Sequence, residues 1–287
     1  MKLLKAVGFL LLIGLFYMIA TAVVAFVMGI VGAISGGYTD VDSLDAFLSN
    51  NLALMVIGIN LVTLLFIFIL FSFRKEKSLV KYLNFSKLDI SQILYLLVIG
   101  IALNVFINVA LMLIPRFFNI TRYLEEHDGV IENLTSGNVW ITLFLVIVIA
   151  PIFEEILCRG VILKDFMKST PVWVAVIIQS LVFGFIHGNI VQGSYAFVIG
   201  LVLAVIYLKM KSIWAPIFLH FVFNFVSLFI GYFIDENMTS FLGIIYVMVS
   251  FVILAWFMKV VLSKEYPTQE YITQEVNEED PTYSLDQ

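Results

Sequence analysis

Residues 150–160 read Ala-Pro-Ile-Phe-Glu-Glu-Ile-Leu-Cys-Arg-Gly, so two carboxylates and a guanidinium stand at the end of an almost wholly apolar run. A charged side chain at the centre of a membrane helix costs about 2.5 to 3.5 kcal/mol on insertion scales, so such a group indicates a function and needs a partner. Glu155 and Arg159 are four residues apart and share a helix face, on which they can neutralise each other. Glu154 is rotated by about 100° from that face and stays available for chemistry.

The composition sets the class of protein. Of the 287 residues, 62% are hydrophobic and 13% are charged, and the mean hydropathy is +1.05. These values exclude a soluble domain and predict an all-α, polytopic transmembrane helix bundle that lies in the lipid bilayer. The net charge of -5 does not point to nucleic acid, and a single cysteine, Cys158, excludes an intramolecular disulfide or a multi-cysteine metal site.

Apolar runs of about 20 residues predict about eight helices. The first runs past Ala20-Thr21-Ala22, a signal-peptide-like cleavage site, and we therefore expect an uncleaved first span. Residues 1–263 form the predicted membrane domain, with a catalytic core at about 139–234, and 264–287 form an acidic tail that we expect to be disordered. The predicted spans are Leu3 to Ile34, Leu52 to Phe73, Ile90 to Ile114, Val139 to Leu157, Val172 to His187, Tyr195 to Leu208, Pro216 to Ile234 and Phe241 to Leu262.

Basic residues predict the orientation. If the N-terminus is inside, all of the 16 lysines and arginines except Arg116 and Arg122 fall on the cytoplasmic side. Acidic residues at 40–45, 125–132 and 235–236 then lie outside, and residues 116–138 are expected to be an exterior loop. The sequence therefore predicts an integral cell-membrane protein with both termini in the cytoplasm.

The chain contains three histidines. His127 lies in the acidic outer segment, where a solvated loop residue is expected. His187 and His220 lie in apolar segments predicted to be helical, and Asn224 shares a helix face with His220. A hairpin turn near Thr170 would bring His187 to the depth of Glu154. One buried histidine could simply join helices, but two histidines, an asparagine and a free glutamate favour a functional site.

Three motifs stand in order along the fourth to seventh predicted helices. Together they resemble those of the CAAX protease and bacteriocin-processing (CPBP, Abi) family of intramembrane endopeptidases, which is similar to the Ras-converting CAAX endopeptidases. Each motif alone would often recur by chance, whereas three in order are specific. The motifs are Glu154-Glu155-x-x-x-Arg159, Phe183-x-x-x-His187 and His220-x-x-x-Asn224.

The resemblance implies a peptidase in which Glu154 and His187 activate water, while His220 and Asn224 bind the carbonyl oxygen as it becomes anionic. The chemistry agrees, because hydrolysis without a covalent intermediate needs a base and preorganised donors. Glu155 and Arg159 are then a structural pair. A covalent mechanism through Cys158 is less well supported than a role as a small apolar filler.

Three alternatives stay open. The family implies metal use, and Glu154, His187 and His220 could hold zinc with an open fourth position, although the same residues also work as a metal-free, glutamate-dependent site. The rival function is that of a non-catalytic membrane scaffold, or of a bacteriocin-immunity or signalling protein of the same fold. A proton or ion transporter is a less well supported function, since the other spans offer amides rather than ionisable residues. The predicted substrate is a membrane-held or lipidated peptide, or a membrane protein.

Overall fold

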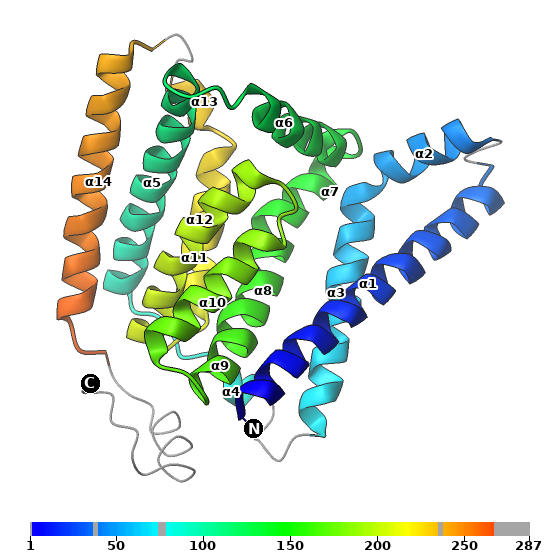
Figure 1. Cartoon of the computed structure of the whole chain (residues 1–287), viewed down its shortest axis with the longest axis horizontal. Helices are drawn as coiled ribbons and strands as arrows, with labels where there is room; N and C mark the ends of the chain where they lie inside the picture. The colour runs from blue at the N-terminus through cyan, green and yellow to red at the C-terminus, as the bar shows by residue number, and fades with distance from the viewer. Residues whose placement is uncertain (1, 37–39, 74–78, 235–237, 267–287) are drawn as a thin grey trace.

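The computed structural model of the chain describes residues 2–36, 40–73, 79–234 and 238–266. All regular structure in these residues is helical, and the helices form one bundle (Figure 1). Six helical segments are long and apolar enough to span a membrane, and two shorter apolar helices join them. The predicted class, an all-α polytopic bundle, is confirmed.

The long spans are α1 (Lys2–Ile34), α3 (Leu52–Ser72), α5 (Ile90–Leu113), α11 (Ile190–Met210) and α14 (Ser240–Ser263). The sixth is Val139–Met167, built from α7 (Val139–Phe144), η2 (Leu145–Ile149), α8 (Ala150–Glu155), η3 (Ile156–Leu163) and α9 (Lys164–Met167). The short apolar helices are α10 (Val172–Phe185) and α12 (Trp214–Ser227). The remaining elements are α2 (Val41–Asn50), α4 (Leu79–Leu83), η1 (Ile114–Arg116), α6 (Thr121–Thr135) and α13 (Ile230–Phe233).

Four predicted boundaries are wrong. The fourth predicted span does not end at Leu157 but continues through η3 and α9 to Met167.

The other three differ for local reasons. The fifth predicted span ends at Phe185, because Gly188 takes a positive φ of 76° and turns the chain. The sixth begins at Ile190, where the Asn189 side chain caps the helix by accepting from the Gln192 N–H. The seventh ends at Ser227, and α13 follows it as a separate turn.

Most of the packed core lies in the α5 to α14 part of the bundle, and buried residues of α1, α3 and α4 such as Ile13, Phe71 and Tyr82 join it. There α5 packs against α12 and α14, and α10 packs against α11. A Cβ atom added to Gly184 of α10 would lie 2.6 Å from the carbonyl oxygen of Gly193 in α11, so the two backbones approach more closely than any other residue would allow. Glycine here sets the distance between the two helices that flank the second motif.

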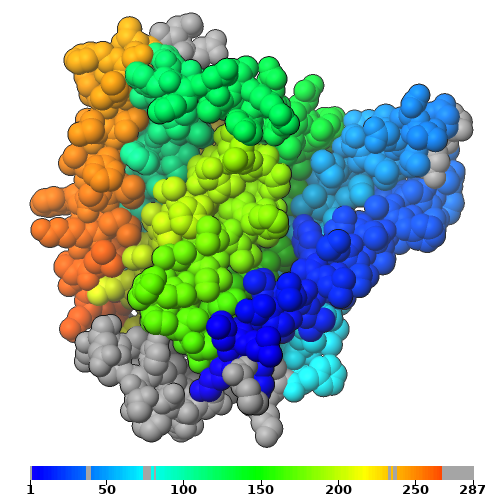
Figure 2. Space-filling view, in the orientation of Figure 1, coloured from blue at the N-terminus to red at the C-terminus, as the bar shows by residue number. Residues whose placement is uncertain are grey.

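Helix α1 differs from the core helices. Its 33 residues would extend about 50 Å, well beyond a hydrocarbon layer of about 30 Å, so it must tilt to remain in lipid. It crosses α3 diagonally, and its far end projects from the bundle together with α2 (Figures 1 and 2). Most of its large apolar side chains are exposed, as expected for a face that meets lipid.

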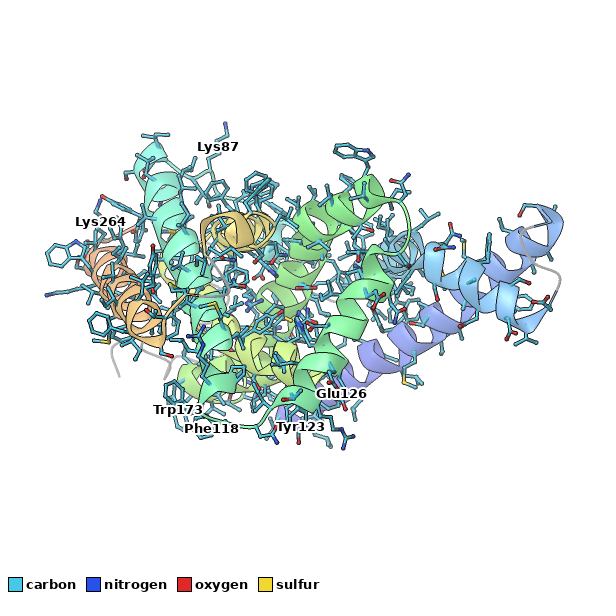
Figure 3. The ribbon with its side chains drawn as sticks, turned by 90° about the horizontal axis from the view of Figure 1, so that it is seen from above. Lys87, Phe118, Tyr123, Glu126, Trp173 and Lys264 are labelled. Carbon is cyan, nitrogen blue, oxygen red and sulfur yellow. The ribbon has the colours of Figure 1, made fainter. Side chains whose placement is uncertain are left out.

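The predicted exterior loop at 116–138 is mostly helix, so that prediction is wrong. Apolar residues recur at helical spacing between the acids of α6, and α6 packs across the end of the bundle against α2, α3, α7 and α11. Figure 3 shows Phe118, Tyr123 and Glu126 pointing outward along one edge of the molecule. This end of the bundle is therefore covered by an amphipathic helix.

The start of α1 and the end of α14 lie at the same end of the bundle, as an even number of crossings requires (Figure 1). The predicted tail starts at Lys264, but Lys264 donates a 2.8 Å hydrogen bond to the Tyr95 hydroxyl and Tyr266 packs on the core. The rest of the tail, the basic residues at 74–77 and the acidic pair at 235–236 lie outside the described residues. Which side of the membrane holds the termini stays a prediction.

Candidate active site

The span that carries Glu154 and Glu155 is not a regular α-helix. Wide π-helical turns occupy residues 145–149 and 156–163, on either side of α8. Such turns are rare and frequently lie at functional sites. Pro151 follows the first one, and because proline has no N–H, the carbonyl five residues earlier, that of Val146, has no backbone donor in this wide register.

Asn224 supplies the hydrogen bond that Pro151 cannot. Its Nδ2 donates to the Val146 carbonyl at 2.8 Å, from α12 across to the wide turn. Only one of the two amide hydrogens is needed for this bond. Asn224 is half-buried, so the third motif is tied directly to the helix of the first.

The predicted pair of Glu155 and Arg159 is present. Arg159 Nη1 donates to Glu155 Oε1 at 2.8 Å, and both side chains are fully buried. The same Glu155 oxygen lies 2.9 Å from His220 Nδ1. Sequence reasoning missed this second partner, which lies 65 residues away in the chain.

Glu154 faces a different side and is partly accessible, with 17% of its side chain exposed. Its Oε2 lies 3.8 Å from His220 Nε2. The His220 ring therefore stands between two carboxylates, one buried and one open.

Phe183 is the apolar centre of the site. The Arg159 guanidinium carbon lies 4.5 Å from the centroid of its ring, and the rings of His187 and His220 meet it edge-on at 5.0 and 5.8 Å. Phe183 is buried, and its contacts with three polar side chains fix their relative positions. The sequence indicated only that Phe183 begins the second motif, and it did not predict these contacts.

His187 does not lie inside a helix, contrary to expectation, but in the turn that follows α10. Its Nδ1 lies 2.7 Å from the Phe183 carbonyl oxygen, and the ring is half-buried. Among the described hydrogen bonds and ion pairs none joins His187 to Glu154, whereas His220 approaches Glu154 directly.

Two more polar side chains support the site. Arg159 Nη2 and Gln179 Nε2 both donate to the carbonyl of Gly200, at 3.1 and 3.2 Å. Asn104 of α5 donates from Nδ2 to the Phe223 carbonyl and the Ser227 hydroxyl, which fastens α5 to α12. Amides in otherwise apolar spans were the only sequence signal for Gln179 and Asn104.

The environment of Glu154 includes two tyrosines. The hydroxyls of Tyr17 in α1 and Tyr195 in α11 are both within electrostatic range of its carboxylate. The Tyr195 ring meets His127 of α6 edge-on, with centroids 6.2 Å apart. His127 is only 19% exposed, so the expectation of a solvated loop residue is wrong: α6 folds it against α11.

The candidate zinc ligands do not converge. In the part of the chain that the structure describes, no three His, Cys, Asp or Glu side chains gather as metal ligands would. Both site histidines have Nδ1 engaged, a pattern that suits metal ligands, but Glu154, His187 and His220 do not form the required set.

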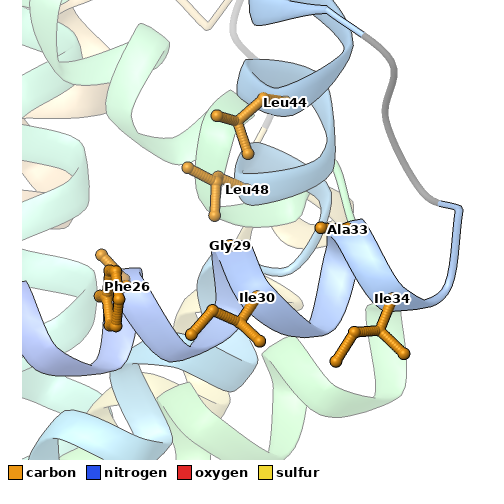
Figure 4. Close-up of a pocket in the computed structure, with 8 residues that line it drawn as sticks. Phe26, Gly29, Ile30, Ala33, Ile34, Leu44 and Leu48 are labelled. Carbon is orange, nitrogen blue, oxygen red and sulfur yellow. The ribbon is translucent and has the colours of Figure 1, made fainter.

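Other features are separate from this site. Cys158 is fully buried in the core, as a small apolar filler would be. An apolar groove of about 400 Å³ lies between α1 and α2 and is lined by residues such as Phe26, Ile30 and Leu48 (Figure 4). A second, of about 210 Å³, lies between α5 and α14. Neither groove contains a residue of the cluster around Glu154.

The fold and site define a polytopic helical membrane protein with a carboxylate–histidine cluster inside its bundle. Residues 136–226 match the family described as Type II CAAX prenyl endopeptidase Rce1-like. This region contains all three motifs, so the match confirms the resemblance that they predict.

A curated relative matches a segment of this chain that is comparable in length to the family match. The chain is 28% identical over 109 residues to a Bacillus subtilis (strain 168) protein named "Putative membrane peptidase YdiL". The matched segment is 37% of this chain and 43% of the relative, so it spans less than half of the relative's length. No solved structure matches the chain.

Proposed function

We propose that the chain is an intramembrane endopeptidase that hydrolyses a peptide bond in a membrane-held or lipidated peptide. The observation that carries this proposal is the 3.8 Å approach of Glu154 Oε2 to His220 Nε2, within the residues that match CAAX-type endopeptidases. A sheltered carboxylate beside an imidazole nitrogen suits general base catalysis. The surrounding helices bury most of the site, and the low dielectric of a buried site strengthens its charge interactions.

In the proposed reaction Glu154 accepts a proton from water while the water oxygen bonds to the carbonyl carbon of the scissile peptide. The carbonyl electron pair moves to oxygen and forms a tetrahedral oxyanion. The carbonyl then re-forms, the C–N bond breaks, and the departing nitrogen takes the proton from Glu154. The products are a carboxylic acid and an amine, and the glutamate is regenerated.

The structure leads us to revise the division of the histidines. We assign His220 to the water, because it is the histidine beside Glu154. Asn224 keeps one amide hydrogen for the oxyanion after its bond to Val146. His187 stays in the proposed site as a ring whose Nε2 is open, since Phe183 engages its Nδ1.

The test uses the full chain in lipid nanodiscs, incubated with membrane peptides and lipopeptides in H₂¹⁸O and read by mass spectrometry. Hydrolysis predicts new C-termini that carry one ¹⁸O. General base catalysis is typically worth about 10² to 10⁴-fold, so Glu154→Gln should slow cleavage by that factor. Glu126→Gln, an exposed acid on α6, is the control and should cleave like the wild type.

Two results would count against the proposal. Cleavage by Glu154→Gln at the wild-type rate would remove Glu154 as the base. If no peptide is cleaved, and Glu154→Gln still performs the protein's role in cells, the scaffold alternative would replace the peptidase.

A further inference from the structure

The two nitrogens of His220 face different glutamates. Nδ1 lies 2.9 Å from Glu155 Oε1, and Nε2 lies 3.8 Å from Glu154 Oε2. Glu155 is fully buried, whereas Glu154 is partly exposed. One ring thus links a closed, structural side of the cluster to an open side on which a substrate can arrive.

The buried contact determines where the ring carries its proton. Arg159 stays charged in proteins, and its 2.8 Å bond to Glu155 Oε1 pairs it with a carboxylate. An ionised carboxylate only accepts hydrogen bonds, so His220 Nδ1 must be the donor. A neutral imidazole has one N–H, and its Nε2 then presents a lone pair.

We propose that Glu155 is a positioning residue that holds His220 in the Nδ1–H tautomer, so that Nε2 faces Glu154 as a hydrogen-bond acceptor. This rests on the proposed function, which it deepens. Two acceptors 3.8 Å apart can each take one hydrogen of the same water molecule. The water's lone pairs are then directed away from both, toward a peptide carbonyl.

The elements around Glu155 are suited to hold it still. Arg159 is fixed at Nη2 by the Gly200 carbonyl and stacks over Phe183, which also meets the His220 ring edge-on. A carboxylate that orients a histidine from behind is a recurrent arrangement in hydrolases and metal sites. The simpler alternative is that Glu155 is only half of a buried ion pair, and the two readings differ in what they predict for His220.

The direct test is the ¹⁵N spectrum of histidine-labelled full-length protein in nanodiscs. The chain has three histidines, and His220→Asn identifies the signals of the relevant ring by their loss. We expect a pyrrole-type Nδ1 and a pyridine-type Nε2 in the wild type. A proton on Nε2, alone or together with one on Nδ1, would overturn the proposal without any further variant.

Two double variants separate positioning from structure. Glu155→Met with Arg159→Met removes the ion pair and leaves Nδ1 without an acceptor, whereas Glu155→Gln with Arg159→Gln removes the charges but keeps an acceptor oxygen. Replacing both members of a buried pair often leaves folding intact. The Met variant should lose the Nδ1–H tautomer and lower kcat by about 10² to 10⁴-fold with little change in KM, and the Gln variant should retain the tautomer and more activity.

The exposed pair of Arg122 and Glu126 on α6 provides the matched control, since it is also an i,i+4 pair. Changing both to glutamine should alter neither tautomer nor kcat. A folded Met variant with wild-type kcat and an unchanged tautomer would overturn the proposal. If the wild type cleaves nothing, the proposed function fails, while the spectrum still tests the tautomer.

Discussion

The N-terminal helices and the central helices differ in length, in regularity and in exposure. Helix α1 has 33 residues, is regular and is mostly exposed, whereas α10 and α12 have 14 residues each and flank a span with two π-helical turns. Fourteen residues extend about 21 Å, less than the hydrocarbon thickness. Irregular backbone at that depth is tolerated only where protein or a cavity surrounds it. The polar cluster lies where the helices are short and covered.

The largest expected effect is on stability in the central region. Arg159→Ala should lower the free energy of unfolding by about 3 to 5 kcal/mol, because it leaves Glu155 buried without its guanidinium partner. The Thr21 hydroxyl in α1 donates a hydrogen bond within its own helix, so Thr21→Ala should change the free energy of unfolding by no more than about 0.5 kcal/mol. Denaturant unfolding in detergent measures both.

The partly exposed Glu154 sharpens the same test. Glu154→Gln keeps the shape of the side chain and should spare folding. If Glu154→Gln proved less stable than Arg159→Ala, the division between a structural and a chemical glutamate would be wrong.

Asn224→Ala is expected to have the next largest effect, on turnover. Loss of one oxyanion donor typically costs about 10² to 10³-fold, or about 2.7 to 4 kcal/mol, so residual cleavage should remain measurable. The variant also leaves the Val146 carbonyl without its side-chain donor. Single-turnover cleavage rates give the answer, and a rate equal to wild type would remove Asn224 from the mechanism.

Replacing a glycine by alanine should change stability in opposite directions in the two regions. Gly184→Ala places a Cβ 2.6 Å from the Gly193 carbonyl oxygen and should destabilise the protein by about 1 to 3 kcal/mol. Gly14→Ala in α1 meets no atom within 4 Å and should stabilise by up to about 1 kcal/mol through helix propensity. Thermal unfolding of the two variants compares them, and equal shifts would contradict the contrast.

The smallest effect concerns the start of α5. The hydroxyl of Ser91 and the backbone N–H of Gln92 lower the pKa of Asp89, which caps this helix. Its contribution is therefore present above the ordinary aspartate pKa and is lost as the pH falls through the lowered value. Asp89→Ala should lower the free energy of unfolding by about 1 kcal/mol at neutral pH and by less in acid. A difference in melting temperature that grows on acidification would contradict this.

Local patterns predicted much of the molecule. Apolar length alone located the spans, and the i,i+4 rule alone paired Glu155 with Arg159, because both depend on neighbouring residues. The bond between His220 and Glu155 joins residues 65 apart, and that between Asn224 and Val146 joins residues 78 apart. Only tertiary packing decides such partners. His127 was misplaced for the same reason, since α6 is held by helices distant in sequence.

The wide turn at 145–149 also changes how the span must be counted. An extra residue in one turn rotates the helix segment that follows it by about 100° about the helix axis, relative to the segment that precedes it. The span is thus two segments joined out of phase. The first packs against α3, and the second, which also contacts α3, presents Glu154 to His220 of α12. Removing one residue from this turn would bring the segments into phase and rotate both glutamates away from His220, without altering a single side chain of the site.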